Sequence, residues 1–175
     1  MGKKNGLLII FTGDGKGKTT AALGTAMRCC GHKLFSCMIQ FVKGSWKSGE
    51  MVAASCFKEF MEIHAMGRGF IKNGEELGEH RNAALKAWEF AKEVMESGKF
   101  DLVILDELTY PLNLKLLDEE EVVSFLANRR EGLHVIVTGR DAPQSLIDAA
   151  DLVTEMRDIK HPYNRGIVAQ EGIDF

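Results

Sequence analysis

The sequence has 175 residues, of which 45% are hydrophobic and 27% are charged, and it contains only three prolines. This composition is typical of a folded globular protein and excludes a disordered or fibrous one. The formal net charge of -3 gives no global electrostatic reason to expect a nucleic acid or an anionic membrane as a partner. The length suits one hydrophobic core, so we expect a single domain over residues 1–175.

Apolar runs of strand type alternate with segments of helical period along the chain. We predict strands at 7–11, 35–42, 57–64, 102–105, 135–138 and 152–155, and helices at 18–30, 75–97, 118–128 and 143–149. This alternation indicates an α/β fold, with a mainly parallel sheet flanked by helices. The runs at 102–105 and 135–138 are almost continuously apolar, as in strands covered on both faces, so we place them at the centre of the sheet.

The first apolar run is too short for a signal peptide or a membrane span, so we expect a cytoplasmic protein. The cysteines at 29, 30, 37 and 56 include no CxxC pair. We therefore expect reduced and mostly buried thiols. The histidines at 32, 64, 80 and 134 are scattered without ligand spacing and are expected to be structural.

The segment FTGDGKGKTT at residues 11–20 follows the first predicted strand and opens the first predicted helix. In this context, backbone N–H groups of the glycine-rich turn and the helix N-terminus converge on one anion site. Lys18 adds a positive charge there, and Thr19 supplies a hydroxyl suited to Mg²⁺. Thr12 replaces the first glycine of the usual G-x-x-x-x-G-K-[ST] pattern, so this is a variant phosphate loop.

Two further strands end in polar residues. The run at 102–105 ends in Asp106 and Glu107, and in a phosphate-loop protein we expect such a strand to run beside the first one and to bring a carboxylate to the metal. Spacing does not decide between the two acids. The run at 135–138 leads to Arg140, which either meets a phosphate or pairs with a surface acid. The irregular, glycine-rich stretch 44–74 is a candidate binding surface.

Segments distributed over the whole chain resemble the P-loop-type ATP:corrinoid adenosyltransferase family. They read FTGDGKGKTTAALGTAMR, IQFVKGSWKSGE, GRGF, ILDELTYPL, VIVTGR, ADLVTEMRDIKHPY and AQEGIDF. The resemblance implies a RecA-like P-loop NTPase fold. It also implies transfer of the 5'-deoxyadenosyl group of ATP to the Co(I) centre of a corrinoid, with release of triphosphate, in adenosylcobalamin biosynthesis or salvage.

The resemblance also implies roles for individual residues. Phe70 matches the aromatic that displaces the lower axial ligand of cobalt, and we expect Phe70 and Lys18 to serve catalysis. Thr19 and Glu107, with Asp106 beside it, match the Mg²⁺ positions. The ATP-binding positions of the family fall on Gly13, Asp14, Gly15, Lys16, Gly17, Lys18, Thr19 and Thr20.

The chain departs from the family pattern in two places. Family members follow the aromatic with Thr-Trp, whereas this chain has Ile71 and Lys72, so either Phe70 suffices or Trp46 or another side chain of the 44–74 stretch replaces the second aromatic. If Phe70 has no such role, it is a buried loop anchor. Some members also carry an N-terminal helix over the active site, so we expect closure to come from elsewhere, such as the partner subunit of a homodimer.

The expected partners are ATP, the corrinoid and a flavoprotein reductant, with neither nucleic acid nor membrane among them. Two other functions fit a phosphate loop. A RecA-like ATPase needs a water-orienting carboxylate, a trans arginine and a basic track, and no basic cluster stands out. A small-molecule kinase needs an arginine-rich lid, which we do not recognise in the sequence. An ATPase would release phosphate, whereas an adenosyltransferase would release triphosphate.

Overall fold

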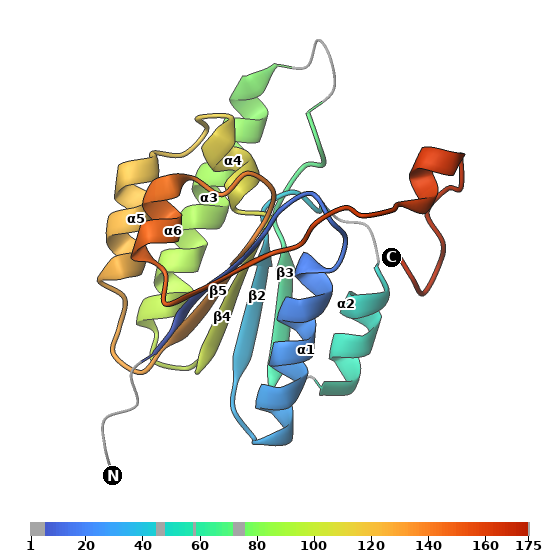
Figure 1. The fold of residues 1–175 in the computed structure, drawn as a ribbon. Coiled ribbons are helices and arrows are strands. Elements are labelled where there is room, and N and C mark those ends of the chain that lie inside the picture. Colours follow the sequence, from blue (N-terminus) through green and yellow to red (C-terminus); the bar gives the residue numbers. More distant parts are fainter. Residues whose placement is uncertain (1–5, 45–47, 58, 72–75, 175) are drawn as a thin grey trace.

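A computed structural model describes residues 6–44, 48–57, 59–71 and 76–174. Its centre is a six-stranded sheet in the order β3-β2-β4-β5-β1-β6, in which every pairing is parallel (Figure 1). The strands are β1 (Leu8–Thr12), β2 (Ser36–Gln40), β3 (Met61–Ala65), β4 (Leu102–Asp106), β5 (His134–Thr138) and β6 (Leu152–Glu155). This arrangement confirms the predicted α/β class.

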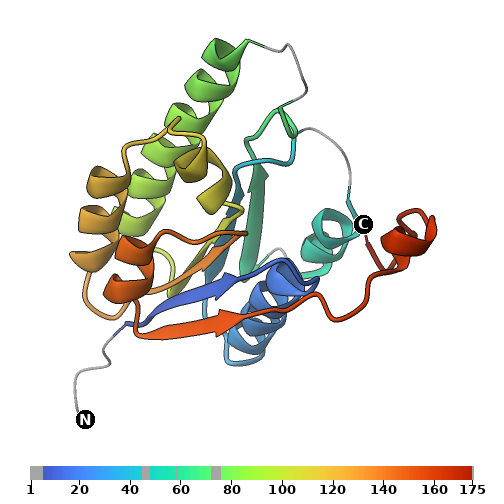
Figure 2. The same ribbon diagram turned by 45° about the horizontal axis from the view of Figure 1, so that its top comes forward.

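Helices cover both faces of the sheet in separate groups (Figures 1 and 2). One face carries α1 (Lys18–Gly31) and α2 (Gly49–Ala54), and the other carries α3 (Leu77–Glu96), α4 (Thr109–Asn113), α5 (Glu119–Ala127) and α6 (Gln144–Ala149). The 3-10 helices η1 (Ser55–Phe57) and η2 (Pro162–Arg165) complete the described elements. None of these helices combines the length and the apolar character that a membrane span requires.

Two apolar clusters hold the layers together. In the larger one, alternate strand residues pack against the helices on the side of α3, and Trp88 of α3 is only 1% exposed. The smaller one joins the other face of the strands to α1 through Ala22 and Ala26. Strands β4 and β5 contribute to both clusters, and this explains why their sequences are apolar at consecutive positions.

Most of the predicted elements are present, and the predicted central position of β4 and β5 is confirmed. The expectation that the strand ending in Asp106 runs beside the first strand is wrong, because β5 lies between β1 and β4. The predicted strand at 57–64 begins only at Met61, and residues 55–57 form η1 instead. The short helices α2 and α4 were not predicted.

The helix start at Asp118 is built as its sequence suggests. The Asp118 side chain accepts a hydrogen bond of 2.9 Å from the backbone N–H of Glu121, and acidic residues fill the first turn of α5. Negative charges at this end interact favourably with the helix dipole and stabilise the helix.

After β6, residues 156–174 leave the sheet and end on the side of α2 (Figure 2).

Candidate active site

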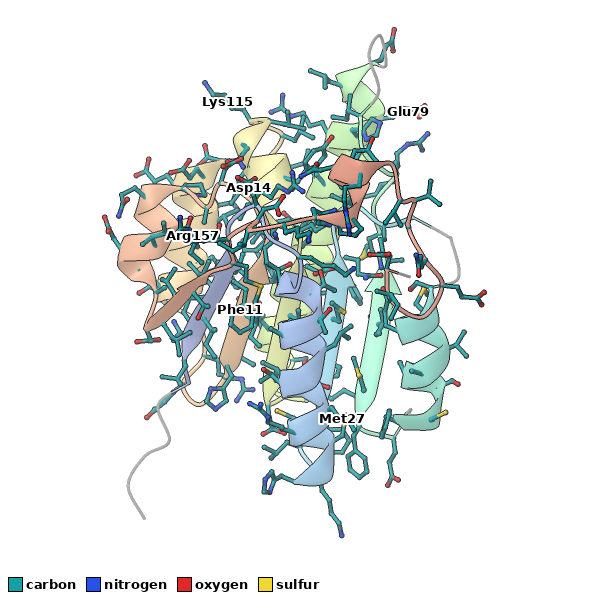
Figure 3. All side chains as sticks on the ribbon, turned by 45° about the vertical axis from the view of Figure 1, so that its right-hand side comes forward. Phe11, Asp14, Met27, Glu79, Lys115 and Arg157 are labelled. Atoms are coloured by element: carbon teal, nitrogen blue, oxygen red, sulfur yellow. The ribbon has the colours of Figure 1, made fainter. Side chains whose placement is uncertain are left out.

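A cavity of about 970 Å³ lies at the carboxyl ends of the strands. The segments that follow β1, β2, β3, β4 and β5 line it, and so does the C-terminal segment. Figure 3 shows Asp14 at this end of the sheet and Met27 near the opposite end of α1. The lining includes all of the described loop residues from Asp14 to Thr20, together with Phe70, Glu107, Arg140 and His161.

The phosphate loop needs glycine at two positions for reasons of backbone conformation. Gly13 has a φ of 91° and Gly17 a φ of 118°, in the region that L side chains rarely adopt. A Cβ atom at Gly13 would also lie 2.4 Å from the carbonyl oxygen of Met156. The same oxygen accepts a hydrogen bond of 2.7 Å from Gly15 N–H. The segment after β6 therefore fixes the shape of the loop.

Positive charge gathers at this loop. The Lys18 ammonium group donates to the carbonyl oxygens of Gly13, at 2.5 Å, and Gly15, at 2.8 Å. Burial, and then the Arg140 guanidinium, lower the pKa of Lys18. Helix α1 begins at Lys18 and has no acidic residue in its first turn, so its positive end faces the cavity without a neutralising charge from that turn.

Lys16 is the second lysine of the loop, and it forms an ion pair with Asp174. Gly172, Ile173 and Asp174 line the cavity on the same side. The C-terminal segment thus contacts the phosphate loop at two places, at Met156 and at Asp174. The sequence did not predict that Asp174 or His161 would line the cavity.

Asp106 is 1% exposed and lies at the centre of a hydrogen-bond network. Its carboxylate accepts hydrogen bonds from Thr19 Oγ1 at 2.8 Å, Thr138 Oγ1 at 2.7 Å and Gln40 Nε2 at 3.3 Å. Burial raises the pKa of Asp106, and these hydrogen bonds oppose the rise. Thr19, in the first turn of α1, therefore contacts Asp106 although β5 lies between β1 and β4.

Glu107 occupies a different place from its neighbour, because it lines the cavity. Its backbone has a φ of 60°, and its N–H donates to Thr138 Oγ1 at 2.9 Å. Burial, and then the Asp106 carboxylate, raise the pKa of Glu107 to about 7. The buried Asp106 carboxylate, the partly buried Glu107 carboxylate and the Thr19 hydroxyl thus supply oxygen atoms at this end of the sheet.

Phe70 lies in the cavity wall with 59% of its surface exposed, so it is no buried anchor. Its ring meets the ring of Tyr110 edge to face, with centroids 5.2 Å apart and an interplanar angle of 90°. The Tyr110 hydroxyl accepts a hydrogen bond of 2.8 Å from Ile71 N–H, which fixes the two segments together. Trp46 and Lys72 lie outside the described residues.

Tyr110 is a site residue that the sequence reasoning missed. It belongs to the quoted segment ILDELTYPL, three residues after Glu107, and α4 turns it into the cavity.

Two more missed residues, Lys43 and Glu50, form an ion pair and line the same cavity. Gln40, which contacts Asp106, has its Oε1 atom buried without a hydrogen-bond partner among the described residues. These three residues belong to the segment IQFVKGSWKSGE.

Arg140 follows β5 and lines the cavity, with its guanidinium 3.9 Å from the carboxylate of Asp14. Both side chains are exposed, so this pair contributes little to stability. His161 accepts a hydrogen bond from Tyr163 N–H through Nδ1, at 3.2 Å, and so caps η2.

Comparison with known proteins agrees with this geometry. Residues 4–175 match the family model described as ATP:corrinoid adenosyltransferase BtuR/CobO/CobP. The chain is 39% identical over 172 residues to the corrinoid adenosyltransferase of Escherichia coli K12, covering 98% of this chain and 87% of the relative. It is also 39% identical over 173 residues to the corrinoid adenosyltransferase CobA of Salmonella typhimurium, covering 99% and 87% of the two chains.

A solved structure with a similar fold is the flagellar accessory protein FlaH from Methanocaldococcus jannaschii. It superposes with a TM-score of 0.54 at 16% identity, covering 88% of this chain and 72% of that chain. This likeness concerns the fold alone, and it supports the predicted RecA-like P-loop NTPase class. The family match and the two relatives extend over nearly the whole sequence. The chain therefore belongs to the ATP:corrinoid adenosyltransferase family, BtuR/CobO/CobP.

Proposed function

We propose that this protein transfers the 5'-deoxyadenosyl group of ATP to the Co(I) centre of a corrinoid and releases triphosphate. The observation that carries the proposal is that one cavity holds both the phosphate loop and an aromatic pair, the exposed Phe70 and the partly buried Tyr110. A simple ATPase needs the first feature alone. A transferase that must place a large planar acceptor beside the nucleotide needs both.

The reaction breaks one bond and forms one bond. An electron pair of Co(I) attacks C5' of ATP, the cobalt–carbon bond forms, and the C5'–O5' bond breaks with its electrons passing to the triphosphate. Because Co(I) is already a strong nucleophile, no general base is required. The protein therefore has to orient the substrates and stabilise the leaving group.

The phosphate loop is suited to hold triphosphate as a leaving group. Lys18, the backbone N–H groups of the loop and the positive end of α1 supply fixed positive charge. Lys16 adds a further charge once the anion replaces Asp174 as its partner. These groups stabilise the negative charge that develops on O5' as the bond breaks.

The oxygen atoms of Thr19, Asp106 and Glu107 fit a Mg²⁺ ion, which prefers hard oxygen ligands. Glu107 and Thr19 face the cavity and would hold the ion, while Asp106 would orient the Thr19 hydroxyl. When bound, Mg²⁺ supplies positive charge to the phosphate oxygens. Burial, and then the Asp106 carboxylate, raise the pKa of Glu107, and the positive charge of a divalent cation would oppose both effects.

For Glu107→Gln we expect the Mg²⁺ concentration for half-maximal activity to rise about tenfold or more, since removing a metal-site group typically costs that much affinity. The unfolding midpoint should change little, because the substitution keeps the shape of a residue on the cavity wall. Glu96→Gln, at the end of α3, is the matched control. An unchanged magnesium titration in Glu107→Gln, together with a large shift in Asp106→Asn, would move the assignment to Asp106.

The direct test of the function is product analysis with ATP and a chemically reduced Co(I) corrinoid. We expect a light-sensitive alkylcorrinoid spectrum, with one triphosphate released for each corrinoid converted. Release of ADP and phosphate without change in the corrinoid would support an ATPase. Phosphorylation of an added small molecule would support a kinase.

We also propose that the protein acts as a homodimer and receives electrons for cobalt from a flavoprotein. The dimer follows from the resemblance to family members, and edge strand β6, whose four residues are all exposed, offers a surface for it. We expect sedimentation equilibrium to give a mass about twice the 19.4 kDa of one chain. A mass equal to that of one chain under assay conditions would contradict this prediction.

A further inference from the structure

We propose that Cys37, Glu62 and His64 form a binding site for a thiophilic divalent cation, with Zn²⁺ as the expected occupant. The ligand atoms of these three residues all lie within 4.8 Å of one another. In a tetrahedral zinc site with bond lengths of about 2.0–2.3 Å, the donor atoms lie roughly 3–4 Å apart. Small side-chain rotations therefore suffice to close the site around an ion.

The sheet itself brings the three residues together. Cys37 of β2 is the register partner of Glu62 of β3, and His64 follows two residues later on the same face of β3. No short ligand motif is visible in the sequence, because Cys37 is far along the chain from Glu62 and His64. Parallel pairing of β2 with β3 brings them together. None of the three is among the described residues that line the active-site cavity, so the proposed site is separate from the phosphate loop.

Neighbouring residues hold the ligand groups in suitable orientations. Lys99 forms an ion pair with Oε1 of Glu62, which leaves Oε2 to face His64 Nε2 at 3.4 Å. The His64 ring packs edge to face on Phe90 of α3, with centroids 4.8 Å apart. Glu62 can therefore bind a cation through Oε2 while its other oxygen keeps Lys99 as an outer partner.

The chemistry of the three groups selects the cation. A thiolate, an imidazole and a carboxylate suit Zn²⁺, whereas Mg²⁺ prefers oxygen ligands alone. Cys37 is fully buried, while the side chains of Glu62 and His64 are 38% and 37% exposed, so an ion can reach the site from the outer surface. Three protein ligands leave a fourth position for water or another donor.

Binding of a cation to Cys37 requires the thiol to lose its proton. Burial, and then the Glu62 carboxylate, raise the pKa of the Cys37 thiol to about 12, so the thiol is protonated before the cation arrives. A divalent cation next to the sulfur favours the thiolate, and each binding event releases one proton to solvent. The bound ion would link edge strand β3 to β2 and stabilise the outer part of the sheet.

The test uses Co²⁺ as a spectroscopic replacement for Zn²⁺ in the reduced, metal-free full chain. We expect one Co²⁺ per chain to produce a sulfur-to-cobalt charge-transfer band, and we expect added Zn²⁺ to remove that band. The active-site residues Thr19, Asp106 and Glu107 hold no sulfur, so ion binding there cannot give this signal. Failure of the proposed enzymatic function would leave this result unchanged.

Variants identify the ligands. Cys37→Ala and His64→Gln should each reduce the charge-transfer band at least about tenfold and remove the rise in melting temperature produced by Zn²⁺. Cys56→Ala and His32→Gln, which change exposed residues, should behave as the unmodified protein does. Circular dichroism shows whether Cys37→Ala has folded, and His64→Gln provides a second ligand change outside the core. The proposal is overturned if the unmodified protein gives no band, or if the band persists in folded Cys37→Ala or in His64→Gln.

Discussion

Replacing Lys18 by alanine should weaken Mg-ATP binding by at least about a hundredfold, which takes it below the range of titration calorimetry. The ammonium group lies inside the loop, where it now contacts the carbonyl oxygens of Gly13 and Gly15. Phosphate oxygens would replace these partners in the complex. Charge-assisted hydrogen bonds contribute about 1.5–3 kcal/mol each, so the loss of two corresponds to at least two orders of magnitude in Kd.

The matched control for this variant is Lys33→Ala. Lys33 is an exposed lysine just beyond the C-terminal end of α1, at the end of that helix remote from the loop. Its removal changes the net charge by the same amount and should leave ATP affinity within about twofold. Near-normal ATP binding by Lys18→Ala would remove the loop lysine from the binding mechanism.

The second large effect is expected for Phe70→Ala, and it should depend on the oxidation state of the supplied cobalt. With a Co(II) corrinoid and a mild flavin-type reductant, we expect activity to fall at least about tenfold. With chemically pre-reduced Co(I), the variant should keep most of its activity. The physical reason is that an aromatic on the lower face of the corrinoid offers no donor atom and excludes the axial ligand, which makes cobalt easier to reduce.

The structure adds a second residue to this prediction. The Tyr110 ring packs edge to face against Phe70, and the Tyr110 hydroxyl accepts a hydrogen bond from Ile71 N–H. Tyr110→Phe keeps the ring contact and should lose less activity than Phe70→Ala in the Co(II) assay. Phe57→Ala changes a phenylalanine of η1 that is 39% exposed, and it serves as the control. Equal losses for Phe70→Ala in both assays would show that Phe70 only shapes the loop.

A comparison of cobalamin with cobinamide extends the same experiment. Cobinamide lacks the lower nucleotide ligand, so a residue that displaces this ligand matters less for it. We therefore expect Phe70→Ala to be less impaired with Co(II) cobinamide than with Co(II) cobalamin. The comparison also indicates which corrinoid the protein prefers.

The features that the sequence predicted well depend on local physical chemistry. Continuous apolarity identified β4 and β5 as central strands, and acidic residues after Asp118 marked the start of α5. The phosphate loop was recognisable because glycines at 13 and 17 permit backbone angles that other residues avoid. Each of these signals lies within a few consecutive residues.

Features that depend on contacts between distant segments could not be predicted. Nothing in the sequence indicated that β5 lies between β1 and β4, because strand order is decided by packing of the whole sheet. Helices α2 and α4 have six and five residues, too few for helical periodicity to be recognised. The contact of Phe70 with Tyr110 joins the loop after β3 to helix α4, 40 residues apart along the chain, and only the folded structure shows it.

The central claim is that the C5'–O5' bond of ATP breaks in the cavity formed by the phosphate loop and the Phe70–Tyr110 pair. The most direct measurement uses ATP that carries oxygen-18 at the bridging O5' position, together with a Co(I) corrinoid. Mass spectrometry of the products then shows which bond was broken. We predict that the label is found in triphosphate and that the unlabelled deoxyadenosyl group is bound to cobalt. Label retained in ADP, with unlabelled phosphate released and no alkylcorrinoid formed, would contradict the account.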